Sequence, residues 1–435
     1  MSKLLFFCPN SSKSLQYVID FITPQFVALE FEFCHSEEYY RHAKEFKINY
    51  SQSRIDPLEF FIWSNEKLNN IEKLELAKIE YQKSNCILFP NVEEDDLGFD
   101  LFAAIFWMLS RFEEKINHRR DEHGRFLSTY SIFAHGKEYK RPLVDEWVDL
   151  FVQKINEKFN SSFQRSTVYK SSLGIDVDQA WKYSNKSLWK SYAAIFRDLL
   201  LFKFQEAKER FSCIALGSKD PYDSFDEILQ LPLNKQELIF FILNGDDPKF
   251  DPNHNLSHPE MIKLIRRIAD KARLGLHPSY RTSEQTQLIQ RQKKELERIA
   301  QKSITCSRQH YLRFLLPDTF IALEKSGIKE DYSMLYADDS GFRSGTSHPF
   351  YYFDIQNNRV TDLIINPVIV MDRTYLKYLK VDPSYIFNDL NFLIQQCKKY
   401  KGCVHIVWHN SSMDYHAEWK GWETVLEKIV ALMKS

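Results

Sequence analysis

The 435-residue sequence has no excess of charge of either sign and no hydrophobic run long enough to cross a membrane. Lysine and arginine number 58 and aspartate and glutamate 59, giving a formal net charge of -1. A nucleic-acid-binding protein is expected to carry a basic excess, so this balance argues against one. The most apolar stretch, residues 101–109, is far shorter than the about 20 residues of a membrane-spanning helix. We therefore expect no nucleic-acid partner and no insertion into a membrane.

The sequence also has no pairs of closely spaced cysteines, and we expect no secretory leader. The seven cysteines stand singly, with no CxxC pair, which is typical of reduced thiols and argues against a zinc ribbon. The apolar run at residues 4–8 is too short for the core of a signal peptide and predicts a first β-strand instead. Together these features predict a cytoplasmic protein.

Length and composition predict two domains. With 44% hydrophobic and 15% aromatic residues the chain can fill packed cores, and 435 residues are many for a single core. Residues 156–172 are rich in Ser, Asn, Gln and Lys, so we place the domain boundary there. The prediction is a smaller α+β or α/β domain of unknown role over residues 1–165, followed by a second domain over residues 171–435.

Short apolar runs alternate with amphipathic helices in the second domain. Seven such runs are candidate strands, at residues 173–177, 238–244, 274–276, 303–306, 333–337, 363–370 and 403–408. Repeated strand–helix units imply a parallel sheet, and this number of units fits a closed or nearly closed β/α barrel. An open doubly wound sheet is the alternative that the pattern leaves open. Helical periodicity over residues 188–211 predicts a helical insertion over about residues 182–232.

Three of the predicted strands end in residues that can carry chemistry. Asp176 and Asp178 stand two apart at the end of the first strand, so both side chains point to one side. Two neighbouring carboxylates repel each other unless a cation neutralises them, and a metal ion is one such cation. His277 follows the third strand and His409 ends the last one. Because active sites of β/α barrels lie at the C-terminal ends of the strands, we expect these residues to form one site.

Five segments around these residues form an ordered series of motifs. They are Ile-Asp-Val-Asp at 175–178, Leu-His-Pro-Ser-Tyr-Arg at 276–281, Ser-Arg-Gln-His-Tyr-Leu-Arg-Phe at 307–314, Pro-Val-Ile-Val-Met-Asp-Arg-Thr at 367–374 and Val-Trp-His-Asn at 407–410. The series resembles the motifs of the NodB-homology polysaccharide deacetylases, carbohydrate esterase family four. The resemblance implies a distorted seven-stranded β/α barrel over residues 171–435. The whole chain is similar to uncharacterised bacterial members with an N-terminal domain of unknown role, which share the wording Gly-Phe-Arg-Ser-Gly-Thr-Ser-His-Pro-Phe at residues 341–350.

The resemblance implies catalytic roles at the matching positions. Asp176 would be the catalytic base, and Arg308 would orient it, with Arg313 as the rival for that role. His409 would be the general acid, and Asp372 would hold it in its charged form. Asp178 and His277 would bind a divalent metal, which is expected to be zinc, with nickel or cobalt as alternatives.

One departure from the family's second motif changes the metal prediction. The family has another metal histidine four residues after the first, and that position here is Arg281, which cannot bind a cation. Catalytic zinc sites usually have three protein ligands, whereas Asp178 and His277 supply two. We expect the third ligand to be His348, with His310 as the second candidate. Otherwise the metal is bound weakly or is absent.

The resemblance further implies a hydrolase that removes an acetyl group, as an amide or an ester, from a sugar or polysaccharide precursor. The expected partner is an acetylated sugar or oligosaccharide, and the oligomeric state is left open. The alternative is a catalytically inactive or metal-free deacetylase-like barrel that binds a glycan or a protein. A glycosidase is disfavoured, because Asp176 and Asp178 share one strand end and cannot easily flank a bond from opposite faces. The candidate substrate contacts are Arg313, Arg343, Tyr280 and Trp408.

Overall fold

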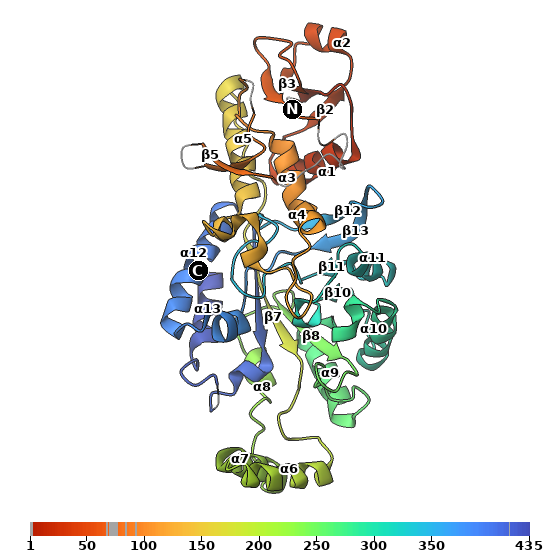
Figure 1. Ribbon diagram of the computed structural model, residues 1–435, viewed down its shortest axis with the longest axis vertical. Coiled ribbons are helices and arrows are strands. Elements are labelled where there is room, and N and C mark those ends of the chain that lie inside the picture. The colour runs from red at the N-terminus through yellow and green to blue at the C-terminus, as the bar shows by residue number, and fades with distance from the viewer. Residues whose placement is uncertain (1–2, 67, 69–76, 83–84, 92–93, 417) are drawn as a thin grey trace. The chain divides into compact units, whose positions relative to one another are not determined.

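Two units that each combine distant parts of the sequence make up the chain in the computed structural model (Figure 1). The structure describes residues 3–66, 68, 77–82, 85–91, 94–416 and 418–435. Unit 1 comprises Met1–Ser171, Leu312–Val370 and Asp389–His405. Unit 2 comprises Ser172–Tyr311, Met371–Asn388 and Ile406–Ser435.

Unit 1 begins with a parallel sheet in the order β2-β1-β3-β4. Its strands are β1 (Leu4–Phe7), β2 (Phe31–Cys34), β3 (Phe46–Ser51) and β4 (Phe60–Trp63), and its first crossovers contain α1 (Lys13–Ile22) and α2 (Glu37–His42). Parallel strands need such crossovers, and the inner strands of a parallel sheet are buried on both faces. This explains why β1 reads Leu-Leu-Phe-Phe and is buried throughout. The first strand predicted at residues 4–8 is confirmed.

The rest of unit 1 contains helices and short strands. They are β5 (Ile79–Gln82), β6 (Asn85–Leu88), α3 (Leu101–Leu109), α4 (Phe112–Ile116), α5 (Leu143–Phe159), α11 (Asp318–Lys325), β11 (Glu330–Asp331), β12 (Phe350–Asp354) and β13 (Arg359–Ile365). Every residue of α3 is buried, and the carboxylate of Asp100 caps it by accepting the backbone N–H of Ala103 over 3.0 Å. The apolar run at residues 101–109 is thus a short buried helix.

A strand predicted at residues 333–337 is wrong. The segment is buried, as its apolar side chains suggested, but its backbone is irregular. The backbone N–H of Leu335 donates to the carbonyl of Ser333 over 2.8 Å, and the backbone N–H of Ser333 donates to the Asp331 carboxylate. These local hydrogen bonds, together with the backbone N–H of Val368 donating to the carbonyl of Met334 over 3.2 Å, satisfy buried backbone groups outside a regular strand.

A cluster of buried charges lies in unit 1. Nε and Nη2 of Arg343 donate to the carboxylate of Glu114 over 3.0 and 2.7 Å, and Nε of Arg111 donates to it over 2.9 Å. Burial acts to raise the pKa of Glu114, but Arg343 and Arg111 lower it to about 2. Nη1 of Arg343 also donates to the carbonyl of Leu335 over 2.9 Å. Arg343 is thus a buried structural residue, contrary to the prediction that it contacts a substrate.

Glu114→Gln is expected to destabilise the protein by about 3 kcal/mol at neutral pH, because two buried guanidinium groups lose their carboxylate. The pKa of Glu114 is about 2 in the folded protein and about 4.3 in an unfolded chain. Its contribution is therefore present above about pH 4.3 and is lost as the pH falls toward 2. Urea unfolding at several pH values measures the difference, and the exposed Glu122→Gln serves as the control. A difference that stays constant between pH 7 and pH 3 would contradict this account.

Unit 2 is organised around parallel strands that follow the order β10-β9-β8-β7, with β15 beyond β7. The strands are β7 (Lys170–Val177), β8 (Leu238–Asn244), β9 (Arg273–Pro278), β10 (Cys306–Ser307) and β15 (Cys403–His409). In register, Asp176 on β7 lies beside Phe241 on β8, and His277 on β9 lies beside Leu243 on β8. Parallel pairing brings the C-terminal ends of β7, β8 and β9 to one edge of the sheet.

Helices follow these strands as the amphipathic pattern predicts. They are α8 (Phe225–Leu229), α9 (Pro259–Lys271), α10 (Gln287–Ala300) and α13 (Val425–Lys434), while α12 (Pro383–Lys399) begins in unit 2 and continues in unit 1. Figure 1 shows β7 and β8 in the middle of unit 2, with α9 and α10 on one side and α13 on the other. The parallel α/β organisation is confirmed. The strand pairings of the described residues form a linear order, which does not show the closed seven-stranded barrel.

The segment between β7 and β8 is helical. α6 (Leu188–Leu200) and α7 (Phe204–Ala215) form a hairpin within the stretch where an insertion was predicted, residues 182–232. Both helices are shorter than the about 20 residues that a bilayer requires. Throughout the described part of the chain, no helix combines the length and the apolar character needed to cross a membrane.

Candidate metal-binding and acid–base site

Arg308 holds Asp176 at the end of β7. Nη1 of Arg308 donates to Oδ1 of Asp176 over 2.6 Å, and both side chains are buried. The guanidinium also lies over the ring of Phe241, with 4.2 Å between Cζ and the ring centroid. A charge-assisted hydrogen bond between two packed side chains fixes the orientation of the carboxylate. The pair that the resemblance implied, Asp176 with Arg308, is therefore formed in the structure.

A glycine in β7 makes room for this ion pair. A Cβ atom at Gly174 would lie 2.3 Å from Nη2 of Arg308, closer than two unbonded heavy atoms approach. Glycine inside a strand gives no side chain to pack and usually marks a close approach of another group. Gly174 in the Leu-Gly-Ile-Asp sequence of β7 therefore leaves room for the guanidinium of Arg308 next to Asp176.

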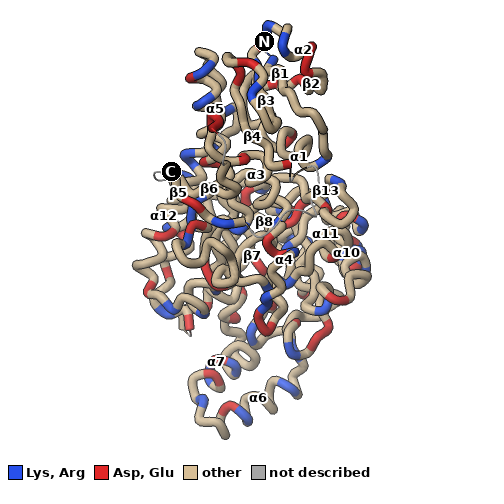
Figure 2. The backbone as a smooth tube through the Cα atoms, turned by 45° about the horizontal axis from the view of Figure 1, so that its top comes forward, with Lys and Arg blue, Asp and Glu red and all other residues tan. Residues whose placement is uncertain are grey.

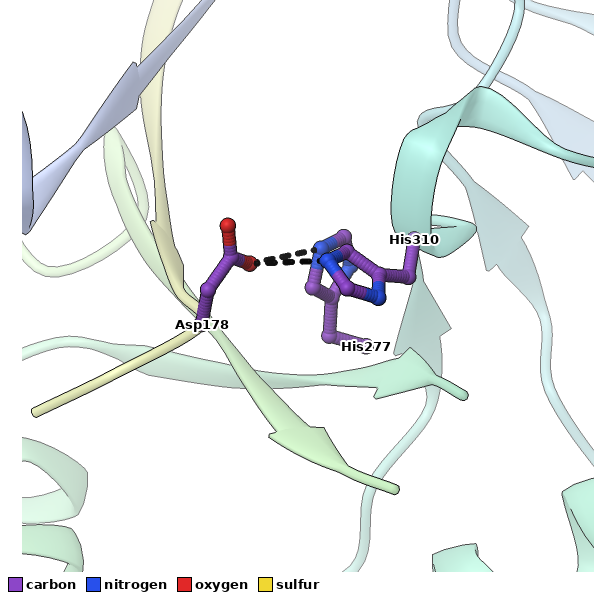
Figure 3. A group of neighbouring side chains, drawn as sticks. All are labelled: Asp178, His277 and His310. Atoms are coloured by element: carbon purple, nitrogen blue, oxygen red, sulfur yellow. Dashed lines mark ion pairs between the residues drawn. The ribbon is translucent and has the colours of Figure 1, made fainter. Parts of the chain in front are cut away.

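Asp178, His277 and His310, from three different segments, converge on one another (Figure 3). Nε2 of His277 also lies 3.8 Å from Oδ2 of Asp176. Oδ1 of Asp178 lies 3.3 Å from Nε2 of His277 and 3.6 Å from Nε2 of His310. Two ligand atoms of a tetrahedral zinc ion, each about 2.1 Å from the metal, are about 3.4 Å apart. The two distances therefore match the spacing of ligands around one ion, and all three ligand atoms lie within 4.8 Å of one another.

The remaining ring nitrogens orient the two histidines. Nδ1 of His277 donates to the main-chain carbonyl of Arg308, and Nδ1 of His310 lies 3.0 Å from Oδ1 of Asp251. Contacts of this kind fix a metal-binding ring and leave Nε2 for the ion. Oδ1 of Asp178 is buried and has no hydrogen-bond partner among the described residues, so it is an acceptor that a cation would satisfy. The group fits a divalent metal with one carboxylate and two imidazole ligands.

The charges of the group also fit a cation. Burial acts to raise the pKa of Asp178, but His310, His277 and His409 hold it well below its usual range. Burial acts to lower the pKa of His310, but Asp178 and Asp251 raise it to about 9. The carboxylate thus attracts positive charge, either as protons on the histidines or as a metal ion. Because a metal binds deprotonated imidazole, acid is expected to compete with it.

His409 lies near Oδ2, the second carboxylate oxygen of Asp178. Its Nδ1 is 2.7 Å from Oδ1 of Asp372, and its Nε2 is 3.7 Å from Oδ2 of Asp178. The second oxygen of Asp372 accepts the backbone N–H of His409 over 2.8 Å and the hydroxyl of Ser412 over 2.6 Å. Burial acts to lower the pKa of His409, but Asp372 and the nearby carboxylates raise it. The imidazole is therefore stabilised in its protonated form, as a general acid requires.

The structure brings His310, and not His348, into the metal group. His348 lies in unit 1, where its Nε2 is 3.0 Å from the carbonyl oxygen of Tyr400 and 3.2 Å from Nη1 of Arg165. These contacts occupy the ring nitrogen that would bind a metal. The first candidate for the third ligand is thus replaced by the second, which follows the short strand β10.

Tyr280 belongs to an aromatic group near the metal ligands. Its ring stacks on Phe250 with 4.0 Å between the centroids, and it meets the edge of Tyr311 at 5.3 Å. Tyr311 lies 4.7 Å from the ring of His310 and is partly exposed. Partly exposed aromatic rings of this kind offer an apolar face to a ligand.

Two other predicted substrate contacts, Trp408 and Arg313, interact with other residues of the protein. Trp408 is almost completely buried between Trp419 and Trp422, at centroid distances of 6.2 and 6.3 Å, so a substrate cannot reach it. Nε of Arg313 donates to the carbonyl of His123 over 2.9 Å, and both residues lie in unit 1. Trp408 is thus a core residue, contrary to the prediction.

The sequence interpretation missed Asp251. It lies in the loop after β8, where its carboxylate accepts the backbone N–H of Tyr280 over 3.0 Å as well as contacting His310. Gly245 permits this position, because a Cβ there would lie 2.3 Å from Cγ of Asp251. The sequence predicted where β8 ends. Because functional residues of β/α folds lie at or after the C-terminal ends of strands, the loop after β8 was a candidate for such a residue. Asp251 lies seven positions after Asn244, the last residue of the strand, so the strand-end rule did not identify it.

Among known proteins, a family model matches the N-terminal part of the chain. Residues 4–160 match a family of unknown function, DUF7033. A comparison with curated proteins gives no match. A solved polysaccharide deacetylase from Bacillus cereus, Bc1974, is 12% identical with a TM-score of 0.25, covering 59% of this chain and 87% of that one.

Two further solved structures are similar over about the same share of the chain. One is a provisionally assigned polysaccharide deacetylase from Mycobacterium smegmatis, 14% identical with a TM-score of 0.38, covering 62% of this chain and 85% of that one. The other is a provisionally assigned polysaccharide deacetylase involved in O-antigen biosynthesis from Bordetella bronchiseptica. It is 13% identical with a TM-score of 0.31, covering 60% of this chain and 89% of that one. All three identities are 14% or lower and all three TM-scores are 0.38 or lower, so these similarities carry no argument about the chemistry of this chain.

Proposed function

We propose that the protein is a metal-dependent hydrolase that removes an acetyl group from a sugar or a polysaccharide precursor. The observation that carries the proposal is the convergence of a three-ligand group, Asp178, His277 and His310, with two proton-transfer groups, Asp176 and His409. A ligand set of this size leaves a coordination position open, as catalytic zinc sites do. Zinc suits one carboxylate and two imidazoles, and nickel or cobalt are alternatives.

Asp176 and His409 divide the proton transfers between them. Asp176, aimed by Arg308, accepts a proton from the water that attacks the acetyl carbonyl. His409, kept protonated by Asp372, donates a proton to the nitrogen or oxygen of the sugar as it leaves. An amine in particular cannot depart without that proton, because it is too basic as an anion. Asp178, His277 and His310 would hold the metal, which would supply Lewis-acid chemistry for the acetyl carbonyl.

Tyr280 and its stacked partner Phe250 provide the substrate contact in this proposal. Sugar rings have apolar faces of C–H groups that pack on aromatic rings, and Tyr311 extends the same surface toward His310. Arg313 remains a proposed substrate contact from the family resemblance.

Acetate release tests the proposal directly. The protein is stripped with a chelator, reconstituted with zinc, nickel or cobalt, and incubated with N-acetylated and O-acetylated oligosaccharides. Metal-dependent release of acetate from any of them is the expected result. Bound metal without acetate release, together with saturable binding of the same oligosaccharides, would instead favour a glycan-binding protein.

A further inference from the structure

The α6–α7 hairpin exposes an unusual amount of apolar surface. Trp189 is 81% exposed and Phe202 is 80% exposed. A contiguous apolar patch on a protein surface usually marks an interaction site. The exposed large apolar side chains of the hairpin are Leu188, Trp189, Tyr192, Phe196, Leu199, Leu200, Leu201, Phe202, Phe204, Phe211 and Leu216.

A mostly buried ion pair contributes to the contact between the two helices. The buried residues of α6 are Ser191 and Asp198, which are seven positions apart and so lie on one side of the helix. Asp198 accepts hydrogen bonds from Nε and Nη2 of Arg210 on α7, over 3.0 and 2.8 Å. A helix in a water-soluble protein normally turns its apolar side inward. α6 has the opposite arrangement, because its buried residues are polar and its large apolar side chains are exposed. Figure 1 shows the hairpin apart from the strands of unit 2.

The hairpin also carries positive charge. Residues 186–216 contain six lysines and arginines against three aspartates and glutamates, although the whole chain has a formal net charge of -1. Figure 2 marks the charged residues along α6 and α7. Lys190 and Arg197 are seven residues apart, as are their neighbours Trp189 and Phe196, so a line of cations borders a line of aromatic rings.

We propose that the hairpin binds peripherally to the surface of an anionic lipid bilayer. Its aromatic and leucine side chains would enter the boundary between headgroups and acyl chains, while its exposed lysines contact lipid phosphates. Helices of 13 and 12 residues lie on a bilayer and do not span it. Self-association is the other way to cover an apolar surface, but two hairpins with the same positive charge repel each other. The proposal is independent of the acetyl-hydrolase function.

Sedimentation with vesicles tests the proposal on the full-length protein. Vesicles of phosphatidylcholine and phosphatidylglycerol in equal parts are expected to bind the protein. Pure phosphatidylcholine vesicles are expected to bind it more weakly, and added salt to weaken the binding to anionic vesicles. Absence of binding to anionic vesicles would overturn the proposal.

Two pairs of substitutions separate the apolar and the charged contributions. Trp189→Ser with Phe202→Ser, and separately Lys190→Glu with Lys203→Glu, are each expected to lower the affinity for anionic vesicles by about tenfold or more. All four side chains are exposed, so the fold is expected to be retained.

The matched control is Tyr39→Ser with Leu58→Ser, which removes exposed apolar side chains of unit 1 and should leave vesicle binding unchanged. Equal losses in the control and in the hairpin variants would overturn the assignment to the hairpin. A dimer in solution that Trp189→Ser with Phe202→Ser dissociates, without any lipid binding, would replace the bilayer by a second copy of the chain.

Discussion

Asp176→Asn is expected to lower the rate of acetate release by about a thousandfold. The asparagine keeps the shape of the side chain and an oxygen that can accept the hydrogen bond from Arg308, so the packing beneath β7 remains. It cannot take a proton from water, so the reaction loses its base. The initial rate of acetate release at saturating zinc measures the effect, and the melting temperature and the bound metal are recorded for the same preparation.

Asp270→Asn is the control for this experiment, because it makes the same chemical change at an exposed carboxylate on α9. It should leave the rate unchanged. An Asp176→Asn variant as active as the wild type would remove Asp176 from the reaction. A variant that is inactive but has also lost its metal or its fold would show that Asp176 acts through the structure instead.

His310→Ala is expected to lower the affinity for zinc by about a hundredfold or more, because it removes one of three ligands. His348→Ala is expected to leave zinc affinity unchanged, because that ring contacts the carbonyl of Tyr400 and the guanidinium of Arg165. Both histidines are buried, which makes the two variants a matched pair. Chelator competition, with circular dichroism as a check of folding, measures the two affinities.

The pair of variants also tests which interpretation of the metal site is correct. Loss of zinc from His348→Ala with retention in His310→Ala would restore the prediction made from the sequence. Retention in both would mean that neither histidine is a ligand, and the metal group would then reduce to Asp178 and His277. Weaker zinc binding at low pH is expected in the wild type, because protons compete for His310, whose pKa is raised to about 9.

The sequence predicts those parts of the site that stand at the ends of regular strands. Asp176, Asp178, His277 and His409 follow apolar runs whose length and β-branched or aromatic content mark buried strands. Parallel strands end at one edge of a sheet, so the sequence alone predicts that these residues lie close together.

The parts that could not be predicted lie in irregular segments. His310 is followed by Tyr311 and Leu312, which have φ values of 60° and 53°, although neither is a glycine. Only tertiary packing holds such residues in the left-handed region. The local sequence therefore does not predict the turn that orients His310 toward Asp178. Asp251 depends in the same way on a loop. The division at residues 165 and 171 stays a prediction, since each unit of the structure combines distant segments.

Arg308 serves both halves of the site at once. Its guanidinium holds Asp176, and its main-chain carbonyl holds the ring of His277. Any shift of the two-residue strand that precedes it, β10, would therefore disturb the base and a metal ligand together. Substitutions on the two sides are then energetically coupled, so the losses from Asp176 and His277 variants should not add in the double variant. We therefore expect the catalytic base and the metal ligand to lose their function together.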